Sequence, residues 1–100
     1  MSLVSENPNP GQTEVREVEI SNDAGLHARP ASVFVKLAAK FESEIWVGHD
    51  GDRVNGKSII GLLTLAAAKG TRITVEAEGS DAQAAVVALA ELVENKFQAD

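Results

Sequence analysis

The feature that most constrains the fold is a change of hydrophobic period along the chain. Apolar residues alternate with charged ones in residues 13–20 and 71–79, which is typical of half-buried strands. From residue 28 to 41, and again over 80–97, they recur at helical spacing, which predicts amphipathic helices. The apolar positions that carry these predictions are Val15, Val18 and Ile20; Ala31, Phe34, Val35, Ala38 and Phe41; Ile73, Val75 and Ala77; Val86, Leu89, Val93 and Phe97.

Between these segments the sequence predicts a hairpin and a further helix. "SEIWVGHDGDRV" has the Asp-Gly turn of a tight hairpin at residues 50–51. Residues 57–70 then predict a helix with Ser58 as its N-cap and Gly70 as its end. The order β-α-β-β-α-β-α favours an α+β fold: an open-faced two-layer sandwich with helices on one face of a four-stranded, mainly antiparallel sheet.

Length and composition limit the class of protein. One hundred residues predict one domain, and we assign residues 1–12 to a flexible N-terminal arm and 13–100 to the folded domain. The absence of cysteine excludes disulfides, thiolate metal sites and cysteine nucleophiles, and is compatible with a cytoplasmic protein. No apolar run is long enough to span a bilayer, and the start is not a signal peptide.

The charge distribution suggests what kind of partner the chain meets. A formal net charge of −6 argues against nucleic acid and anionic membranes as partners. Two segments, 24–41 and 53–75, nevertheless contain no acid. They hold most of the basic residues: Arg29, Lys36 and Lys40 in the first, and Arg53, Lys57, Lys69 and Arg72 in the second. Either these residues lie by chance on solvated faces, or they form one basic face that binds an acidic partner or a phosphate.

The stretch "GLHARPAS", residues 25–32, is the candidate site. Pro30 fits only the first turn of a helix, so the helix begins near Ala28 and His27 stands at its N-cap. A helix N-terminus offers unpaired N–H groups and a partial positive charge, and Arg29 adds a planar donor suited to phosphate oxygens. The pattern predicts an imidazole that carries a phosphoryl group, with Ala28 and Arg29 binding its oxygens.

Other interpretations of His27 are less specific. A histidine near a helix start is often only a solvated residue. A metal site needs more ligands, and the chain offers only His49 in addition and no cysteine, so we predict neither metal nor cofactor. A serine hydrolase needs a nucleophile elbow, and the sequence has no G-x-S-x-G.

The helix over 57–70 is more apolar than a core-facing helix requires. Between residues 59 and 68 every residue is apolar or small except Thr64. Leu62, Leu65 and Ala66 could cover the core, which leaves three surplus residues: Ile59, Ile60 and Leu63. Either the loop before His27 covers them, or they form an exposed docking patch rimmed by Arg29, Lys36 and Lys57.

Three quoted segments together carry a family resemblance: "GLHARPASVFVKLAAKF", "VNGKSIIGLLTLAAAKG" and "ITVEAEGSDAQAAV". The chain resembles the histidine-containing phosphocarrier (HPr) family of the bacterial phosphoenolpyruvate-dependent sugar phosphotransferase system, over about residues 13–97. The resemblance implies that enzyme I phosphorylates His27 on Nδ1 and that sugar-specific IIA proteins receive the phosphoryl group. It also implies that Arg29 and Pro30 belong to the active loop.

The resemblance has further implications. Ser58 matches the serine that an ATP-dependent HPr kinase/phosphorylase modifies in many bacteria. The protein is then a monomeric, cytoplasmic, stoichiometric carrier rather than an enzyme. Two alternatives stay open: a regulatory module that binds partners without phosphotransfer, and one domain of a larger phosphotransferase protein.

Overall fold

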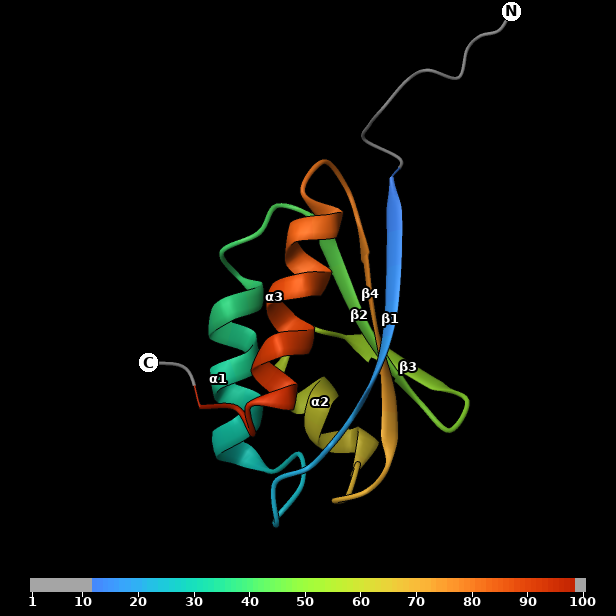
Figure 1. Cartoon of the computed structure of the whole chain (residues 1–100). Helices are drawn as coiled ribbons and strands as arrows, with labels where there is room; N and C mark the ends of the chain where they lie inside the picture. The colour runs from blue at the N-terminus through green and yellow to red at the C-terminus, as the bar shows by residue number, and fades with distance from the viewer. Residues whose placement is uncertain (1–11, 99–100) are drawn as a thin grey trace, which may run out of the picture.

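The computed structural model describes residues 12–98, and its element order is the predicted one (Figure 1). The bounds are β1 Thr13–Glu19, α1 Ala28–Ala38, β2 Glu44–His49, β3 Asp52–Asn55, α2 Ile59–Leu65, β4 Arg72–Glu78 and α3 Ala82–Glu94. Of the expected arm, only Gln12 lies among the described residues, and its carbonyl accepts a hydrogen bond from Gly79 N–H at 2.8 Å. Gln12 therefore contacts the turn that follows β4 (Arg72–Glu78).

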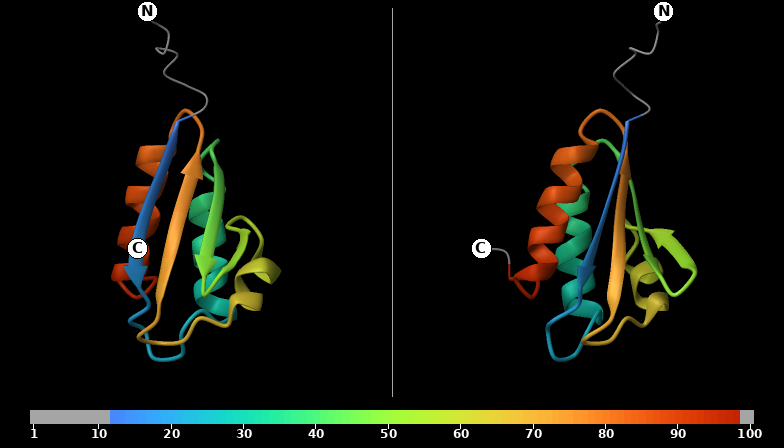
Figure 2. Two further views of the ribbon diagram at one scale, coloured as in Figure 1. Left: turned by 90° about the vertical axis from the view of Figure 1, so that its right-hand side faces the viewer. Right: turned by 45° about the vertical axis from the view of Figure 1, so that its right-hand side comes forward.

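The four strands form one antiparallel sheet in the order β1-β4-β2-β3. Strand β4, late in the sequence, lies between β1 and β2, which places Val75 opposite Arg16 on one side and opposite Val47 on the other. The helices lie on one face and the other face is open, as Figure 2 shows. The predicted α+β open-faced sandwich is confirmed.

The core fills the space between the sheet and the helices. Every second residue of the central strands points into it, and it meets the apolar sides of α1, α2 and α3. Val15 was expected among these residues, but it is 58% exposed on the open face. The two-residue period of a strand explains the error, because Val15 and Val18 are an odd number of residues apart. Side chains fully buried at the centre include Phe34, Ile45, Val47, Leu62, Ile73, Val75, Leu89 and Val93.

The hairpin between β2 and β3 has the predicted two-residue turn. Asp50 and Gly51 both have left-handed backbone angles, φ 56° and 89°. This is the combination that a tight hairpin requires, because it matches the twist of the flanking strands.

Helix α2 is shorter than the sequence predicted. It ends at Leu65 rather than Gly70, because Ala66 adopts a left-handed conformation, φ 51° and ψ 37°. The next residues run alongside the loop before α1, where the Ala67 carbonyl accepts a hydrogen bond from Leu26 N–H at 2.9 Å. A Cβ on Gly25 would lie 2.6 Å from that carbonyl oxygen, so the approach requires glycine. Tertiary pairing of these two segments takes the place of the last helical turn.

Ser80 and Gln83 have the spacing of a capping box, which predicts Ser80 as the N-cap of α3, but the helix does not begin there. Asp81 is the N-cap, and its side chain makes no capping hydrogen bond. The carboxylate instead accepts hydrogen bonds from Ser43 Oγ–H and from the N–H groups of Glu42, at 2.9 Å, and Ser43, at 3.0 Å. The hydrogen bond from the Ser43 hydroxyl, followed by that from Glu42 N–H, lowers the pKa of Asp81. Asp81 thereby joins α3 to the turn after α1.

Candidate functional site

His27 is the N-cap of α1, as the sequence predicted. Its backbone is extended, φ −96° and ψ −169°, and its carbonyl accepts the Ala31 N–H at 2.9 Å. Its side chain is exposed and makes no capping hydrogen bond. Helix geometry leaves the N–H groups of Ala28 and Arg29 without an acceptor inside the helix. The ring and two free amide donors therefore occupy one end of α1, beside the exposed Arg29 side chain.

The loop that delivers His27 is held by backbone and side-chain contacts. Asn22 accepts the Gly25 N–H at 3.1 Å through its carbonyl and donates from Nδ2 to the Gly25 carbonyl at 2.7 Å. Gly25 has a left-handed φ of 72°, and Leu26 is buried in the core. With the contact to Ala67, these interactions fix the direction in which the chain enters α1.

A shallow pocket of about 350 Å³ lies beside His27. Two segments far apart in the sequence line it, the loop and first turns of α1 and the turn that follows α3. We call it the His27 pocket, and its lining residues are Asn22, Asp23, Ala24, His27, Arg29, Pro30, Val33, Lys96, Phe97 and Gln98. No local sequence pattern indicates that Lys96 and Phe97 line this pocket, because only the packing of α3 brings them here.

Ser58 is the N-cap of α2, also as predicted. Its Oγ accepts the Gly61 N–H at 3.0 Å, and its carbonyl accepts the Leu62 N–H at 3.0 Å. The hydroxyl is half-buried. Asn55 supports this turn by accepting the Lys57 N–H through Oδ1 at 2.8 Å. Ser58 therefore has a structural role in addition to any modification.

The surplus apolar residues of α2 are on the surface. Ile59, Ile60 and Leu63 are 39%, 75% and 38% exposed, and no loop within residues 12–98 covers them; we call them the α2 patch. Leu62 and Leu65 face the core, as expected. Ala66 was expected there too, but it is exposed and Ala67 is buried in its place. The left-handed residue at the end of α2 causes this shift.

The basic residues do not form one continuous face. Three cations of the two acid-free segments pair with acids from elsewhere: Arg53 with Glu76 at 3.3 Å, Lys69 with Asp23 at 2.9 Å, and Arg72 with Glu17 at 3.8 Å. Lys57 donates from Nζ to the Phe41 carbonyl at 2.8 Å. Arg29 and Lys36 are exposed on α1, and their spacing of seven residues places them on one side of that helix, while Lys40 is exposed in the turn that follows it. The basic surface is therefore a stripe of Arg29 and Lys36 along α1, which we call the α1 stripe.

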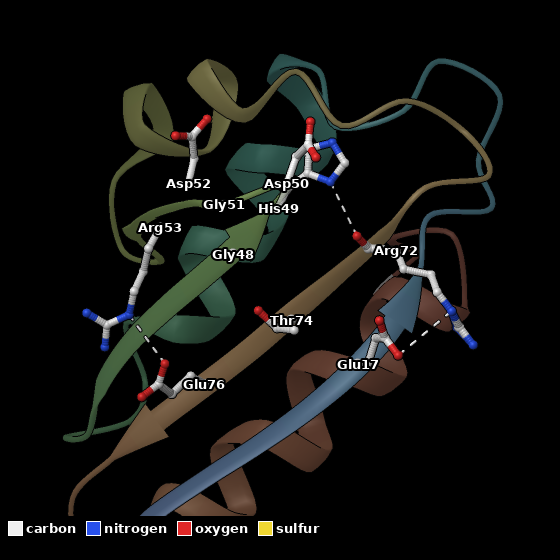
Figure 3. Close-up of a pocket in the computed structure, with 10 residues that line it drawn as sticks. All are labelled: Glu17, Gly48, His49, Asp50, Gly51, Asp52, Arg53, Arg72, Thr74 and Glu76. Carbon is white, nitrogen blue, oxygen red and sulfur yellow. Dashed lines mark hydrogen bonds and ion pairs between the residues drawn. The ribbon is translucent and has the colours of Figure 1, made fainter.

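The second histidine does not line the His27 pocket. His49 ends β2 and lines a depression of about 330 Å³ on the open face of the sheet (Figure 3). Its Nδ1 lies 3.3 Å from the Arg72 carbonyl. The Arg53–Glu76 and Arg72–Glu17 pairs flank the same depression. The geometry gives His49 no role at the His27 pocket.

Metal-binding groups and membrane-spanning helices are both absent from the part of the chain that the structure describes. Within residues 12–98, no group of His, Asp and Glu side chains is arranged to hold a metal ion. In the same range no helix is long and apolar enough to cross a membrane.

Comparison with known proteins agrees with the geometry of the site. Residues 15–95 match the family model described as the PTS HPr component phosphorylation site. The chain is 49% identical to the phosphocarrier protein HPr of Neisseria meningitidis over 82 residues, which are 82% of this chain and 92% of that protein.

Solved structures show the same likeness. HPr from Thermoanaerobacter tengcongensis superposes with a TM-score of 0.82 at 45% identity, over 87% of this chain and 98% of that one. The catabolite repression protein Crh of Bacillus subtilis, described as a swapped dimer, gives 0.69 at 42% identity, over 84% of this chain and 97% of that one. The chain therefore belongs to the HPr family of phosphocarrier proteins of the phosphotransferase system.

Proposed function

We propose that this protein accepts a phosphoryl group from phosphorylated enzyme I on His27 and passes it to IIA proteins during sugar uptake. The observation that carries the proposal is the open N-terminus of α1. An exposed imidazole stands there beside two amide donors without helical acceptors, and Arg29 lies two residues further along the chain. A capped or buried histidine could not meet a phosphorylated partner in this way.

The transfer is a displacement at phosphorus. The lone pair of His27 Nδ1 attacks, the new P–N bond forms, and the bond between phosphorus and the donor breaks, so the donor leaves with its electron pair. The three phosphoryl oxygens keep their negative charge, which the amides of Ala28 and Arg29 and the guanidinium stabilise. In the second transfer His27 is the leaving group and a IIA histidine is the nucleophile. The protein ends each cycle unchanged and needs no cofactor.

Docking uses the α2 patch and the α1 stripe. Ile59, Ile60 and Leu63 provide a small apolar centre, and Arg29 and Lys36 provide charge that speeds the encounter with acidic partners. A small contact suits a carrier, because it must dissociate quickly from several proteins in turn. Lys57 belongs to the rim of this surface through its position, although its ammonium is tied to Phe41.

Ser58 is the proposed point of control, through an ATP-dependent HPr kinase/phosphorylase. A phosphate there would bring about −1.5 to −2 charges at neutral pH to the edge of the α2 patch. Because the acidic partners dock against this edge, the added charge would repel them. His27, on another helix, would keep its chemical competence.

The alternatives are a regulatory module that binds partners without phosphotransfer, as a relative of Crh, or one domain of a larger phosphotransferase protein. The exposed His27 favours the carrier, because a pure binding module has no use for an unpaired imidazole at an open helix end. We further propose that the protein acts as a monomer in the cytoplasm, which sedimentation and cell fractionation would test.

Incubation of the protein with phosphoenolpyruvate and enzyme I tests the proposal. We expect a mass increase of one phosphoryl group that is labile to acid and stable to base. Mapping by tandem mass spectrometry should place it on His27. A protein that gains no phosphate under these conditions, while a known HPr does, would be a binding module instead.

A further inference from the structure

The turn that follows α3 has an unusual backbone. Lys96 and Phe97 both have left-handed angles, φ 58° and 63°, and neither is glycine. Residues with a Cβ avoid this conformation unless the surroundings impose it. Here the Phe97 ring is buried in the core, and the Phe97 N–H donates to the Leu92 carbonyl at 2.8 Å. The buried ring thus holds two residues in a strained turn.

This turn brings Lys96 to the His27 pocket, whose wall it forms together with His27 and Arg29. Its Nζ donates to the Ser21 carbonyl at 3.0 Å. Asp23 lines the same pocket, and its pKa is lowered chiefly by the hydrogen bond from Lys69, with a further contribution from the charge of Lys96. Lys96 therefore stands over the loop that leads to His27.

The charges around the pocket favour an anion. Arg29 and Lys96 are the cations that line it, and Asp23 is the acid. Asp23 is already paired with Lys69 at 2.9 Å, and among the described residues the Lys96 ammonium donates its hydrogen bond to the neutral Ser21 carbonyl. A phosphoryl group with two negative charges is a stronger acceptor than a carbonyl, and a lysine stem is flexible enough to turn toward it.

We propose that Lys96 is a second phosphoryl-binding cation, which exchanges the Ser21 carbonyl for a phosphoryl oxygen once His27 is phosphorylated. The inference rests on the proposed phosphocarrier function and deepens it. Lys96 would stabilise the phosphorylated protein more than the unphosphorylated one, in which it binds the neutral Ser21 carbonyl. It would thus help to set the phosphoryl-transfer potential of this carrier.

The test compares Lys96→Met with Lys40→Met, which removes an equal charge from an exposed position in the turn after α1, outside the pocket. The equilibrium constant for phosphorylation is measured with enzyme I at fixed ratios of phosphoenolpyruvate to pyruvate. We expect Lys96→Met to lower it about three- to tenfold, as for the loss of one charge-assisted contact. Lys40→Met should change it less than about twofold, and Lys96→Arg should restore most of it.

A second variant separates binding from stability. Lys96→Gly also removes the ammonium, but glycine suits the left-handed backbone, so this variant should unfold at a higher denaturant concentration than Lys96→Met. It should show the same lowered equilibrium constant. The ¹⁵N signal of Lys96 Nζ should also shift when His27 is phosphorylated.

The outcomes are distinguishable. If Lys96→Met and Lys40→Met have equal equilibrium constants, or the Lys96 signal does not move, the role of Lys96 is refuted while the carrier function stands. If the wild-type protein accepts no phosphoryl group at all, both the function and the role of Lys96 are refuted.

Discussion

The starts of α1 and α2 differ in what happens to the N–H groups that have no acceptor within the helix. At α2 the Ser58 hydroxyl accepts the Gly61 N–H, so a side chain satisfies a donor of the first turn. At α1 the His27 side chain makes no such bond, and the donors of Ala28 and Arg29 stay available. The two residues occupy equivalent N-cap positions, yet one closes its helix end and the other leaves it open.

The difference separates stability from function. A capping hydroxyl stabilises a helix by about 1 kcal/mol, and α2, with only seven residues, depends on it. Helix α1 has eleven residues and buries Pro30, Ala31, Phe34 and Ala38, so it is stable without a cap. Its open end can therefore serve an incoming anion. Packing elsewhere in a helix thus decides whether its N-terminus is free for function.

The largest expected effect comes from His27→Ala. It should abolish phosphoryl acceptance, because no other nucleophile stands at the open helix end, and it should change the unfolding free energy by less than about 0.5 kcal/mol. Phosphate incorporation with enzyme I and urea denaturation measure the two effects. Ser58→Ala is the matched control and should do the reverse, losing about 1 kcal/mol and keeping acceptance. Retained acceptance in His27→Ala would contradict the central assignment.

Substitutions of Arg29 test which groups bind the phosphoryl anion at the open end of α1. Arg29→Gln should slow acceptance about 10- to 100-fold, since the amides of Ala28 and residue 29 still stabilise the phosphoryl oxygens. Arg29→Lys should slow it less, because lysine keeps the charge but loses the planar fork. Single-turnover rates with phosphorylated enzyme I measure both. Equal rates for the two variants would show that the charge is not what matters.

The start of α3 gives a third case, in which the N-cap side chain serves the tertiary structure. Asp81→Asn should destabilise the fold by about 1–3 kcal/mol at pH 7, because it weakens charge-assisted hydrogen bonds from Glu42 and Ser43. The pKa of Asp81 is lowered in the folded state, so this stabilisation is present above the unfolded pKa of about 3.9 and is lost as pH falls through the folded value. The two proteins should therefore converge in unfolding free energy in strong acid. A difference that stays constant down to that pH would exclude the carboxylate as its source.

The smallest expected effect concerns charge at the closed helix end. Ser58→Asp should lower the rate of His27 phosphorylation about three- to tenfold at low salt, since about 1.4 kcal/mol of repulsion weakens an encounter tenfold. The deficit should shrink at high salt, where the repulsion is screened. Stopped-flow rates at two ionic strengths measure it, with Ser58→Ala as the uncharged control. If Asp and Ala variants react equally fast, Ser58 is only a helix cap.

Local sequence patterns predicted the structure correctly where it depends on residues that are neighbours in the chain. Pro30 required the helix to begin near Ala28, which placed His27 at its N-cap. The Asp-Gly pair produced the expected turn, and Ser58 the expected cap. These features depend on backbone angles and on hydrogen bonds within a few residues, and a sequence specifies both.

The tertiary structure decided what depends on contacts between distant segments. Helix α2 ends at Leu65 because Ala67 pairs with Leu26, and no residue near this helix end indicates that pairing. Lys96 reaches the His27 pocket because the buried Phe97 ring holds the turn after α3 in place. By itself the sequence determined the order of the elements and the residue that stands at the open helix end. The packing of that helix against a core built from the whole chain determined which other groups surround it, because no local pattern records contacts made across the core.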